Sequence, residues 1–235
     1  MTPETALQPE SLAQVVIRFA GDSGDGMQLT GDRFTDVSAA FGNDLATLPN
    51  YPAEIRAPAG TIAGVSSFQV QISDHEILTP GDVPSVLVAM NPAALRANID
   101  ELAPGGTILV NSDAFEERNL DKAGYQANPL EDGSLAAYRV IQVAMTSMTL
   151  EATKDLGVKP RDAERSKNFF ALGLLSWLYH RDLDATENFL NEKFSRKPEI
   201  LKANIAALHA GYNYGDTTED FVVRYEVSPA PMPAG

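Results

Sequence analysis

The sequence contains no cysteine, which excludes disulfides, cysteine-ligated iron–sulfur clusters, cysteine-type zinc sites and thiol nucleophiles within these 235 residues. Histidine is scarce as well. His75, His180 and His209 are far apart in the sequence and form no zinc-binding pattern. No side chains are spaced like a nucleophile and its base. We therefore expect no catalytic residue and no metal ligand in this chain.

Positive charge is also in short supply: 18 Lys and Arg face 32 Asp and Glu, so the formal net charge is −14. A non-specific nucleic-acid binder needs the opposite balance, and anionic membrane surfaces are disfavoured for the same reason. No apolar stretch approaches the roughly 20 residues of a membrane span, and the first residues are polar and acidic rather than signal-like. We expect no nucleic-acid partner, no membrane association and a cytoplasmic location.

What the sequence does contain is an alternation of strand-like and helix-like segments over its first 143 residues. The runs at 85–91 and 105–112 are apolar almost throughout, which is typical of strands buried on both faces. Alternation of this kind predicts an α/β, doubly wound fold with a mostly parallel sheet. Strands are predicted at 15–20, 44–49, 61–72, 85–91, 105–112 and 138–143, and helices at 25–41 and 92–102.

From Ala144 onward the pattern is helical, with helices predicted at 144–157, 165–181, 184–194 and 197–215. The helix at 165–181 is apolar almost all round. This predicts a contact with another subunit, and a plain buried helix is the alternative. The end of the chain is proline-rich, like a linker. We divide the chain into a leader (1–13), an α/β domain (14–215) and a C-terminal linker or tail (216–235).

A glycine-rich corner, GDSGDG at 21–26, follows the first predicted strand. Its glycines are spaced GxxGxG, which does not match the GxGxxG dinucleotide fingerprint. Met27 and Gln28 stand where a P-loop needs Lys and Ser or Thr, so ATP hydrolysis is not expected. The triplet Gly24-Asp25-Gly26 with Asn50 is spaced somewhat like a thiamine-diphosphate site, but such triplets are common in turns.

The corner still has the layout of an anion site, because a strand runs through glycines into the N-terminus of a helix. Asp22 and Asp25 complicate this reading, since their carboxylates would compete with a phosphate or cap the helix themselves. A tight, self-capped turn without any ligand is therefore an equal alternative.

Four segments together carry a family resemblance: FAGDSGDGMQLTGDRF, LPNYPAEIRAPAGTIAGVSSFQVQIS, VAMNPAAL and KNFFALGLLSWLY. They resemble the gamma domain (pyruvate/ketoisovalerate oxidoreductase type) of the 2-oxoacid:ferredoxin oxidoreductases. The similarity is closest to the N-terminal part of the 2-oxoglutarate oxidoreductase alpha subunit, and it covers about residues 14–215.

The resemblance implies a part of an enzyme that carries out coenzyme A-dependent oxidative decarboxylation of a 2-oxoacid. For 2-oxoglutarate the product would be succinyl-CoA, with ferredoxin as electron acceptor. Thiamine diphosphate, magnesium and iron–sulfur clusters would belong to partner domains and the beta subunit. This chain would contribute contacts to the coenzyme A channel and between subunits, with no activity alone. A stand-alone nucleotide-binding or regulatory module, or a structural assembly module, is the alternative.

The resemblance also selects candidate contacts to coenzyme A: the glycine corner, the proline loop behind Arg56 with nearby hydroxyls, and two asparagines that end buried strands. Each has a structural alternative. Arg56 could pair with Glu54, Asn91 could cap a helix, and Lys167 and Asn168 are better explained as interface or cap residues. The candidate cofactor-binding residues are Gly21, Asp22, Ser23, Gly24, Gly26, Arg56, Thr61, Ser66, Asn91 and Asn111.

Overall fold

The structure, a computed structural model, describes residues 9–54, 57–79, 83–221 and 223–231. The strands are β1 (Glu10–Leu12), β2 (Gln14–Asp22), β3 (Asp44–Asn50), β4 (Val65–Ser73), β5 (Val86–Ala89), β6 (Thr107–Asn111), β7 (Arg139–Val143) and β8 (Tyr225–Val227). The α-helices are α1 (Met27–Phe41), α2 (Pro92–Asn98), α3 (Glu117–Ala123), α4 (Met145–Thr153), α5 (Pro160–Glu164), α6 (Lys167–Leu178), α7 (Asp184–Lys193) and α8 (Pro198–Thr217). Short 3₁₀ helices are η1 (Ile62–Gly64), η2 (Ile99–Glu101) and η3 (Ser112–Ala114).

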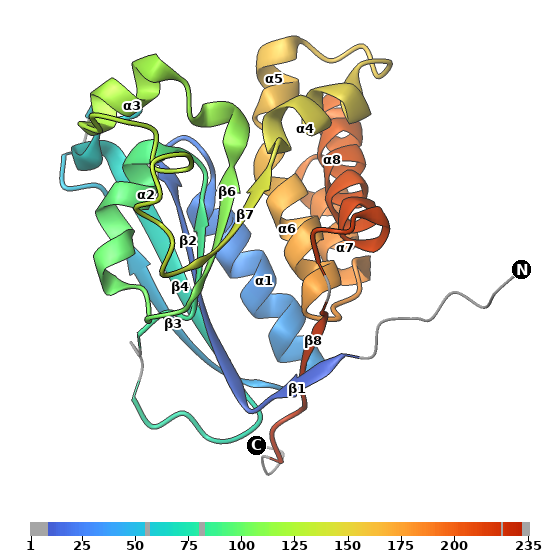
Figure 1. The fold of residues 1–235 in the computed structure, drawn as a ribbon. Helices are drawn as coiled ribbons and strands as arrows, with labels where there is room; N and C mark the ends of the chain where they lie inside the picture. The colour runs from blue at the N-terminus through green and yellow to red at the C-terminus, as the bar shows by residue number, and fades with distance from the viewer. Residues whose placement is uncertain (1–8, 55–56, 80–82, 222, 232–235) are drawn as a thin grey trace, which may run out of the picture.

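Six strands form the central sheet in the order β3-β4-β2-β5-β6-β7 (Figure 1). The strands β2, β5, β6 and β7 pair in parallel, which confirms the predicted, mostly parallel α/β sheet. The exception is β4, which pairs antiparallel with both β2 and β3. Between β3 and β4 the described chain has the 3₁₀ turn η1 and no α-helix, so it lacks the crossover helix that a parallel connection usually requires.

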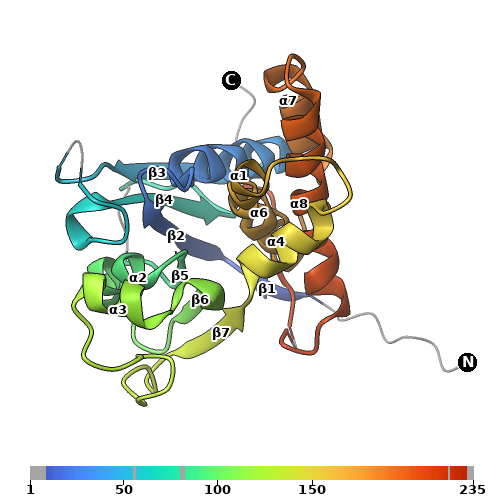
Figure 2. The same cartoon turned by 90° about the horizontal axis from the view of Figure 1, so that it is seen from above.

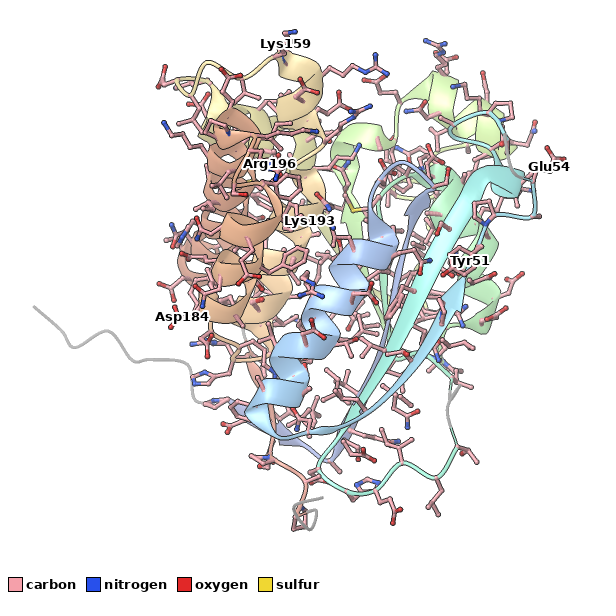
Figure 3. The ribbon with its side chains drawn as sticks, turned by 180° about the vertical axis from the view of Figure 1, so that it is seen from behind. Tyr51, Glu54, Lys159, Asp184, Lys193 and Arg196 are labelled. Carbon is pink, nitrogen blue, oxygen red and sulfur yellow. The ribbon has the colours of Figure 1, made fainter. Side chains whose placement is uncertain are left out.

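Helices cover both faces of the sheet, as Figure 2 shows from above. One face packs against α2 and α3 through Leu87, Ala89, Ile108 and Val110, whereas their neighbours such as Val88 face the opposite layer. Both sets are buried, which explains why the sequence is apolar at every position of β5 and at Ile108, Leu109 and Val110 of β6. The second face is covered by α1 and α6, and α1 crosses it diagonally in the view from behind (Figure 3).

The C-terminal half is helical, as predicted, and α6 lies at its centre. Every α6 residue after Lys167 is buried, among α1, α4 and α8. The predicted subunit contact along α6 is therefore wrong, and the buried-helix alternative is correct. The helices α6 and α8 approach each other through glycines, because a Cβ on Gly173 would lie 1.9 Å from the Leu208 carbonyl oxygen.

The two ends of the described chain meet, which the sequence did not predict. Strand β1 falls in the expected leader and β8 in the expected tail, yet they pair in parallel with Glu10 opposite Tyr225. The Asn43 amide then donates hydrogen bonds to the carbonyl oxygens of Val227 and Ser228, at 3.0 and 2.7 Å. The helix α8 also runs to Thr217, two residues beyond the predicted boundary. The division into domains itself stays a prediction.

Candidate functional site

A polar cleft of about 470 Å³ lies where β2, β5 and β6 reach their carboxyl ends. In Figure 1 this is the upper end of the sheet, between the elements labelled α3 and α5. Open α/β sheets bind their ligands at this edge. Besides Met90 and three small residues of the walls, polar and charged side chains line the cleft: Asp22, Asp25, Asn91, Asn111, Asp113, Glu116, Asn119, Lys122, Thr146, Ser147, Glu164 and Lys167.

The glycine corner forms one wall of the cleft, and its backbone N–H groups are largely engaged within the protein. The Asp25 carboxylate accepts a hydrogen bond from the Asp22 N–H at 2.9 Å. The Ser23 N–H donates to Gly64, and the Asp25 N–H donates back to Asp22. The helix α1 begins after Gly26, whose backbone is left-handed (φ 76°), without a side-chain cap. The Asp25 carboxylate therefore closes the turn and does not cap α1. The alternative that it caps this helix is wrong.

Asp22 connects the glycine corner to the proline loop. Both of its carboxylate oxygens accept from the Gly60 N–H, at 3.0 and 2.9 Å. Burial raises the pKa of Asp22 above its usual 3.8, and the nearby Asp25 carboxylate raises it further. The hydrogen bonds from Gly60 and Asn91 and the charge of Lys167 lower it in turn. Asp22 thus holds the proline loop in place, although partial burial of its carboxylate costs desolvation free energy.

Two lysines reach the cleft from its two sides. The Lys167 ammonium, at the start of α6, lies 3.2 Å from the Asp25 carboxylate and 3.7 Å from that of Glu164. The Lys122 ammonium, on α3, donates to the Ala59 carbonyl at 3.3 Å. Among the described residues that line the cleft there are five carboxylates and only these two cations. The cleft is therefore acidic and favours a neutral or cationic group over a bare phosphate.

The far wall is built from amides and hydroxyls. Asn91 caps α2, because its Oδ1 accepts from the Ala94 N–H at 2.8 Å. Asn111 donates to the Thr146 hydroxyl at 3.0 Å. Asp113 accepts from both the N–H and the hydroxyl of Ser147, at 2.7 and 2.9 Å. The contacts of Asn111 and Asp113 fix the segments after β6 and β7 against each other.

The structure brings together three of the predicted site residues, Asp22, Asn91 and Asn111, in one cleft. Arg56 lies outside the described residues. Ser66 accepts from Gln28 at 3.0 Å and ties α1 to β4 away from the cleft, and Thr61 donates to Pro58 within its own loop at 2.7 Å. Six predicted residues are not among those that line the cleft: Gly21, Ser23, Gly24, Gly26, Thr61 and Ser66.

Sequence reasoning missed most of the polar wall. Asp113 comes two residues after the end of β6, and Thr146 and Ser147 come shortly after β7. The rule that selected Asn91 and Asn111, polar residues at the carboxyl ends of parallel strands, would also have found them. No sequence pattern indicated Lys122, because the helix α3 on which it lies was not predicted. Within the described ranges no cluster of three or more His, Asp or Glu could hold a metal ion. None of the described helices combines the length and the hydropathy that a membrane span requires.

Comparison with known proteins places this architecture in a family. The family described as pyruvate ferredoxin/flavodoxin oxidoreductase matches residues 16–214. The 2-oxoglutarate oxidoreductase subunit KorA of Mycobacterium tuberculosis is 64% identical over 226 residues, which are 96% of this chain and 35% of KorA. The 2-oxoglutarate synthase subunit KorC of Methanothermobacter marburgensis is 30% identical over 163 residues, covering 65% of this chain and 84% of KorC.

Solved structures show the same fold. A 2-oxoglutarate:ferredoxin oxidoreductase from Magnetococcus marinus, with 2-oxoglutarate, coenzyme A and succinyl-CoA bound, aligns with a TM-score of 0.70 at 24% identity over 93% of this chain and 34% of its own. A keto/oxoacid ferredoxin oxidoreductase gamma subunit from Geobacter sulfurreducens aligns with a TM-score of 0.57 at 23% identity, over 87% and 99%. The chain spans about a third of KorA. It belongs to the pyruvate ferredoxin/flavodoxin oxidoreductase family.

Proposed function

We propose that this chain is the gamma-type part of a 2-oxoglutarate:ferredoxin oxidoreductase, and that its cleft borders the coenzyme A channel of the assembled enzyme. The 64% identity to KorA across nearly the whole chain supports 2-oxoglutarate as the substrate. The reaction would be oxidative decarboxylation to succinyl-CoA in the cytoplasm, with ferredoxin as electron acceptor. The observation that carries the channel contact is the meeting of Asp22, Asn91 and Asn111 at the carboxyl ends of the strands.

The reactive groups would be held by partner chains or domains. No cysteine is available here to ligate an iron–sulfur cluster. The Asp25 carboxylate, the obvious candidate for a magnesium ligand in the glycine corner, is engaged by the Asp22 N–H and the Lys167 ammonium. These residues do not fit thiamine diphosphate with its magnesium ion. We therefore assign that cofactor and the clusters to the thiamine-binding alpha domains and the beta subunit.

The charge of the cleft indicates which part of coenzyme A it would contact. Five carboxylates would repel the pyrophosphate, whereas the pantetheine arm is neutral and carries two amides. The side chains of Asn119 and Thr146, which line the cleft, offer hydrogen-bonding partners for such an arm. The phosphates would lie nearer Lys122, whose ammonium contacts the loop that Asp22 holds.

The test uses the enzyme assembled from this chain and its thiamine-binding and cluster-containing partners. Lys122→Gln and Arg56→Ala should each raise the apparent KM for coenzyme A by about three- to tenfold, because each removes one charge-assisted contact. The KM for 2-oxoglutarate and kcat should stay within about twofold, since this proposal assigns the 2-oxoacid to the partner domains. Arg118→Gln is the matched control for Lys122, because Arg118 is an exposed cation on the same helix that does not line the cleft.

An unchanged KM for coenzyme A in both variants would remove the channel contact from the proposal. Turnover of 2-oxoglutarate by the purified chain alone would contradict the assignment of the chemistry to partners. Failure to assemble with any thiamine-binding chain would contradict the proposal as a whole.

A further inference from the structure

A second hollow, a cavity of about 390 Å³, lies at the opposite end of the sheet from the cleft. The first residues of β2, β5, β6 and β7 form its floor. The end of α6 forms a side wall. The paired strands β1 and β8 line it from the remaining side, at the lower end of the molecule in Figure 1. No part of the proposed function uses this cavity.

The walls are mainly apolar. Leu12 of β1, Val86 of β5, Ile141 of β7 and Phe221 contribute side chains, and the last three are at least nine-tenths buried. Two aromatic rings, Tyr179 and Tyr225, stack at a centroid distance of 5.9 Å beside them. A cavity of this size with mainly apolar walls and some polar side chains is typical of a small-molecule site.

Of the residues that the structure describes, only two with a charge line the cavity, Arg139 and Glu10. The half-buried Arg139 guanidinium is 3.4 Å from the Tyr225 hydroxyl, and it makes no ion pair with any carboxylate of the described residues. The buried Arg18, by contrast, is paired with Glu101 and bonded to Gln69. Glu10 is exposed on the β1 side of the cavity. Arg139 therefore has capacity for an anionic partner that this part of the chain does not supply.

We propose that this cavity binds a small amphipathic monocarboxylate, with the carboxylate on Arg139 and an apolar body among Leu12, Val86 and Phe221. An arginine fork matches the planar geometry of a carboxylate, and the charge-assisted bonds would be partly shielded from water. The apolar body would be removed from water by the surrounding side chains. Because β1 and β8 line the cavity, the ligand would also join this two-stranded ribbon to the sheet.

The probes are 4-methylpentanoate and its neutral counterpart 4-methylpentanamide, titrated calorimetrically into the 235-residue chain. The carboxylate should bind saturably with 1:1 stoichiometry, at least tenfold more tightly than the amide. Arg139→Gln should abolish that preference, so that both probes bind with similar, weak affinity. Arg196→Gln should bind like the wild type, since Arg196 lies outside the cavity, on the turn between α7 and α8 labelled in Figure 3.

A second variant keeps the test decisive if Arg139→Gln does not fold. Ala103→Leu adds side-chain volume at a half-buried lining position and should eliminate binding of both probes. Saturation with the carboxylate should also slow amide hydrogen exchange in β1 and β8 of the wild type. The proposal is overturned if millimolar carboxylate does not bind, if the amide binds equally well, or if Ala103→Leu binds like the wild type. None of these results depends on coenzyme A binding at the cleft.

Discussion

The cleft and the cavity lie at opposite ends of the same parallel strands, yet they are built in different ways. The cleft is made by loops that follow the strands, and its polar groups bind one another, as Asp22 with Gly60 and Asp113 with Ser147. The cavity is made by the beginnings of the strands and by the ribbon of β1 and β8, and its walls are mainly apolar. The difference shows that the carboxyl-end site is held by hydrogen bonds from neighbouring loops, whereas the amino-end site depends on an element assembled from distant parts of the sequence.

The helix α6 is the wall that both hollows share. Lys167 at its start lines the cleft, and Leu178 at its end lines the cavity. Its twelve residues span roughly 18 Å. A change in the middle of α6 should therefore affect both sites, whereas changes at the loops or at the ribbon should affect one.

The largest effect is expected for Gly173→Ala, in the middle of α6. The new Cβ would lie 1.9 Å from the Leu208 carbonyl oxygen, a backbone atom that cannot move aside without shifting α8. We expect the free energy of unfolding to fall by about 3 kcal/mol, the upper range for overpacking a core. Urea unfolding measures this change. Binding at both the cleft and the cavity should weaken together.

Gly24→Ala is the matched control for this substitution. A Cβ on Gly24 meets no atom within 4 Å, and the residue is exposed in the glycine corner. Its stability should stay within about 0.5 kcal/mol of the wild type. Equal stability of Gly173→Ala and Gly24→Ala would contradict the close packing of α6 on α8.

A smaller effect, confined to the cavity side, is expected for Val227→Ala in β8. Val227 is fully buried, so the lost methyl groups should destabilise the ribbon by about 1–2 kcal/mol. Amide exchange should accelerate in β1 and β8 and stay unchanged around Asp22 and Gly60. Val83→Ala removes the same atoms from a side chain that is 62% exposed and serves as the control. Faster exchange at Gly60 would show that the two ends of the sheet are not independent.

The sequence predicted the parts of the fold that depend on local periodicity. The apolar runs of β5 and β6 and the helices α1, α2, α6 and α8 all follow from patterns within one segment. The short helix α3 is seven residues long and the strands β1 and β8 three each, which is too short to produce a clear period. The pairing of β1 with β8 joins residues more than 200 positions apart, so no local pattern could indicate it.

The lining of the candidate cleft was predictable where the residue type and its place at a strand end coincided. Asn91 and Asn111 met both conditions and line the cleft. Ser66 and Thr61 were chosen for their hydroxyls alone, and those hydroxyls serve contacts within the fold. The residues of the glycine corner were assigned backbone donors for a ligand, but Asp22 and Asp25 use several of these donors themselves. The spacing of residues in the sequence cannot reveal this competition for backbone N–H groups, because the competition depends on where the carboxylates point in the folded protein.

The smallest effect is expected in the pH dependence of stability in Asp22→Asn, which tests the cleft alone. Because the pKa of Asp22 is raised in the folded protein, the folded state binds more protons than the unfolded chain between about pH 3.8 and the folded pKa. The stability contribution of Asp22 therefore falls as the pH rises through this window and levels off above the folded pKa. In Asp22→Asn the amide oxygen can still accept from the Gly60 N–H. The amide does not titrate, so the fall in stability with rising pH is removed.

Unfolding free energies measured by urea titration at several pH values should show Asp22→Asn gaining stability relative to the wild type as the pH rises above 3.8. Asp132→Asn provides a control of opposite sign, because the side-chain and backbone hydrogen bonds from Ser134 lower the pKa of that exposed carboxyl. The stability that Asp132→Asn loses relative to the wild type should grow as the pH rises towards 3.8 and then level off. If Asp22→Asn instead loses stability relative to the wild type with rising pH, the folded protein stabilises the Asp22 carboxylate in its charged form. The repulsion from the other carboxylates of the cleft is then weaker than their number indicates.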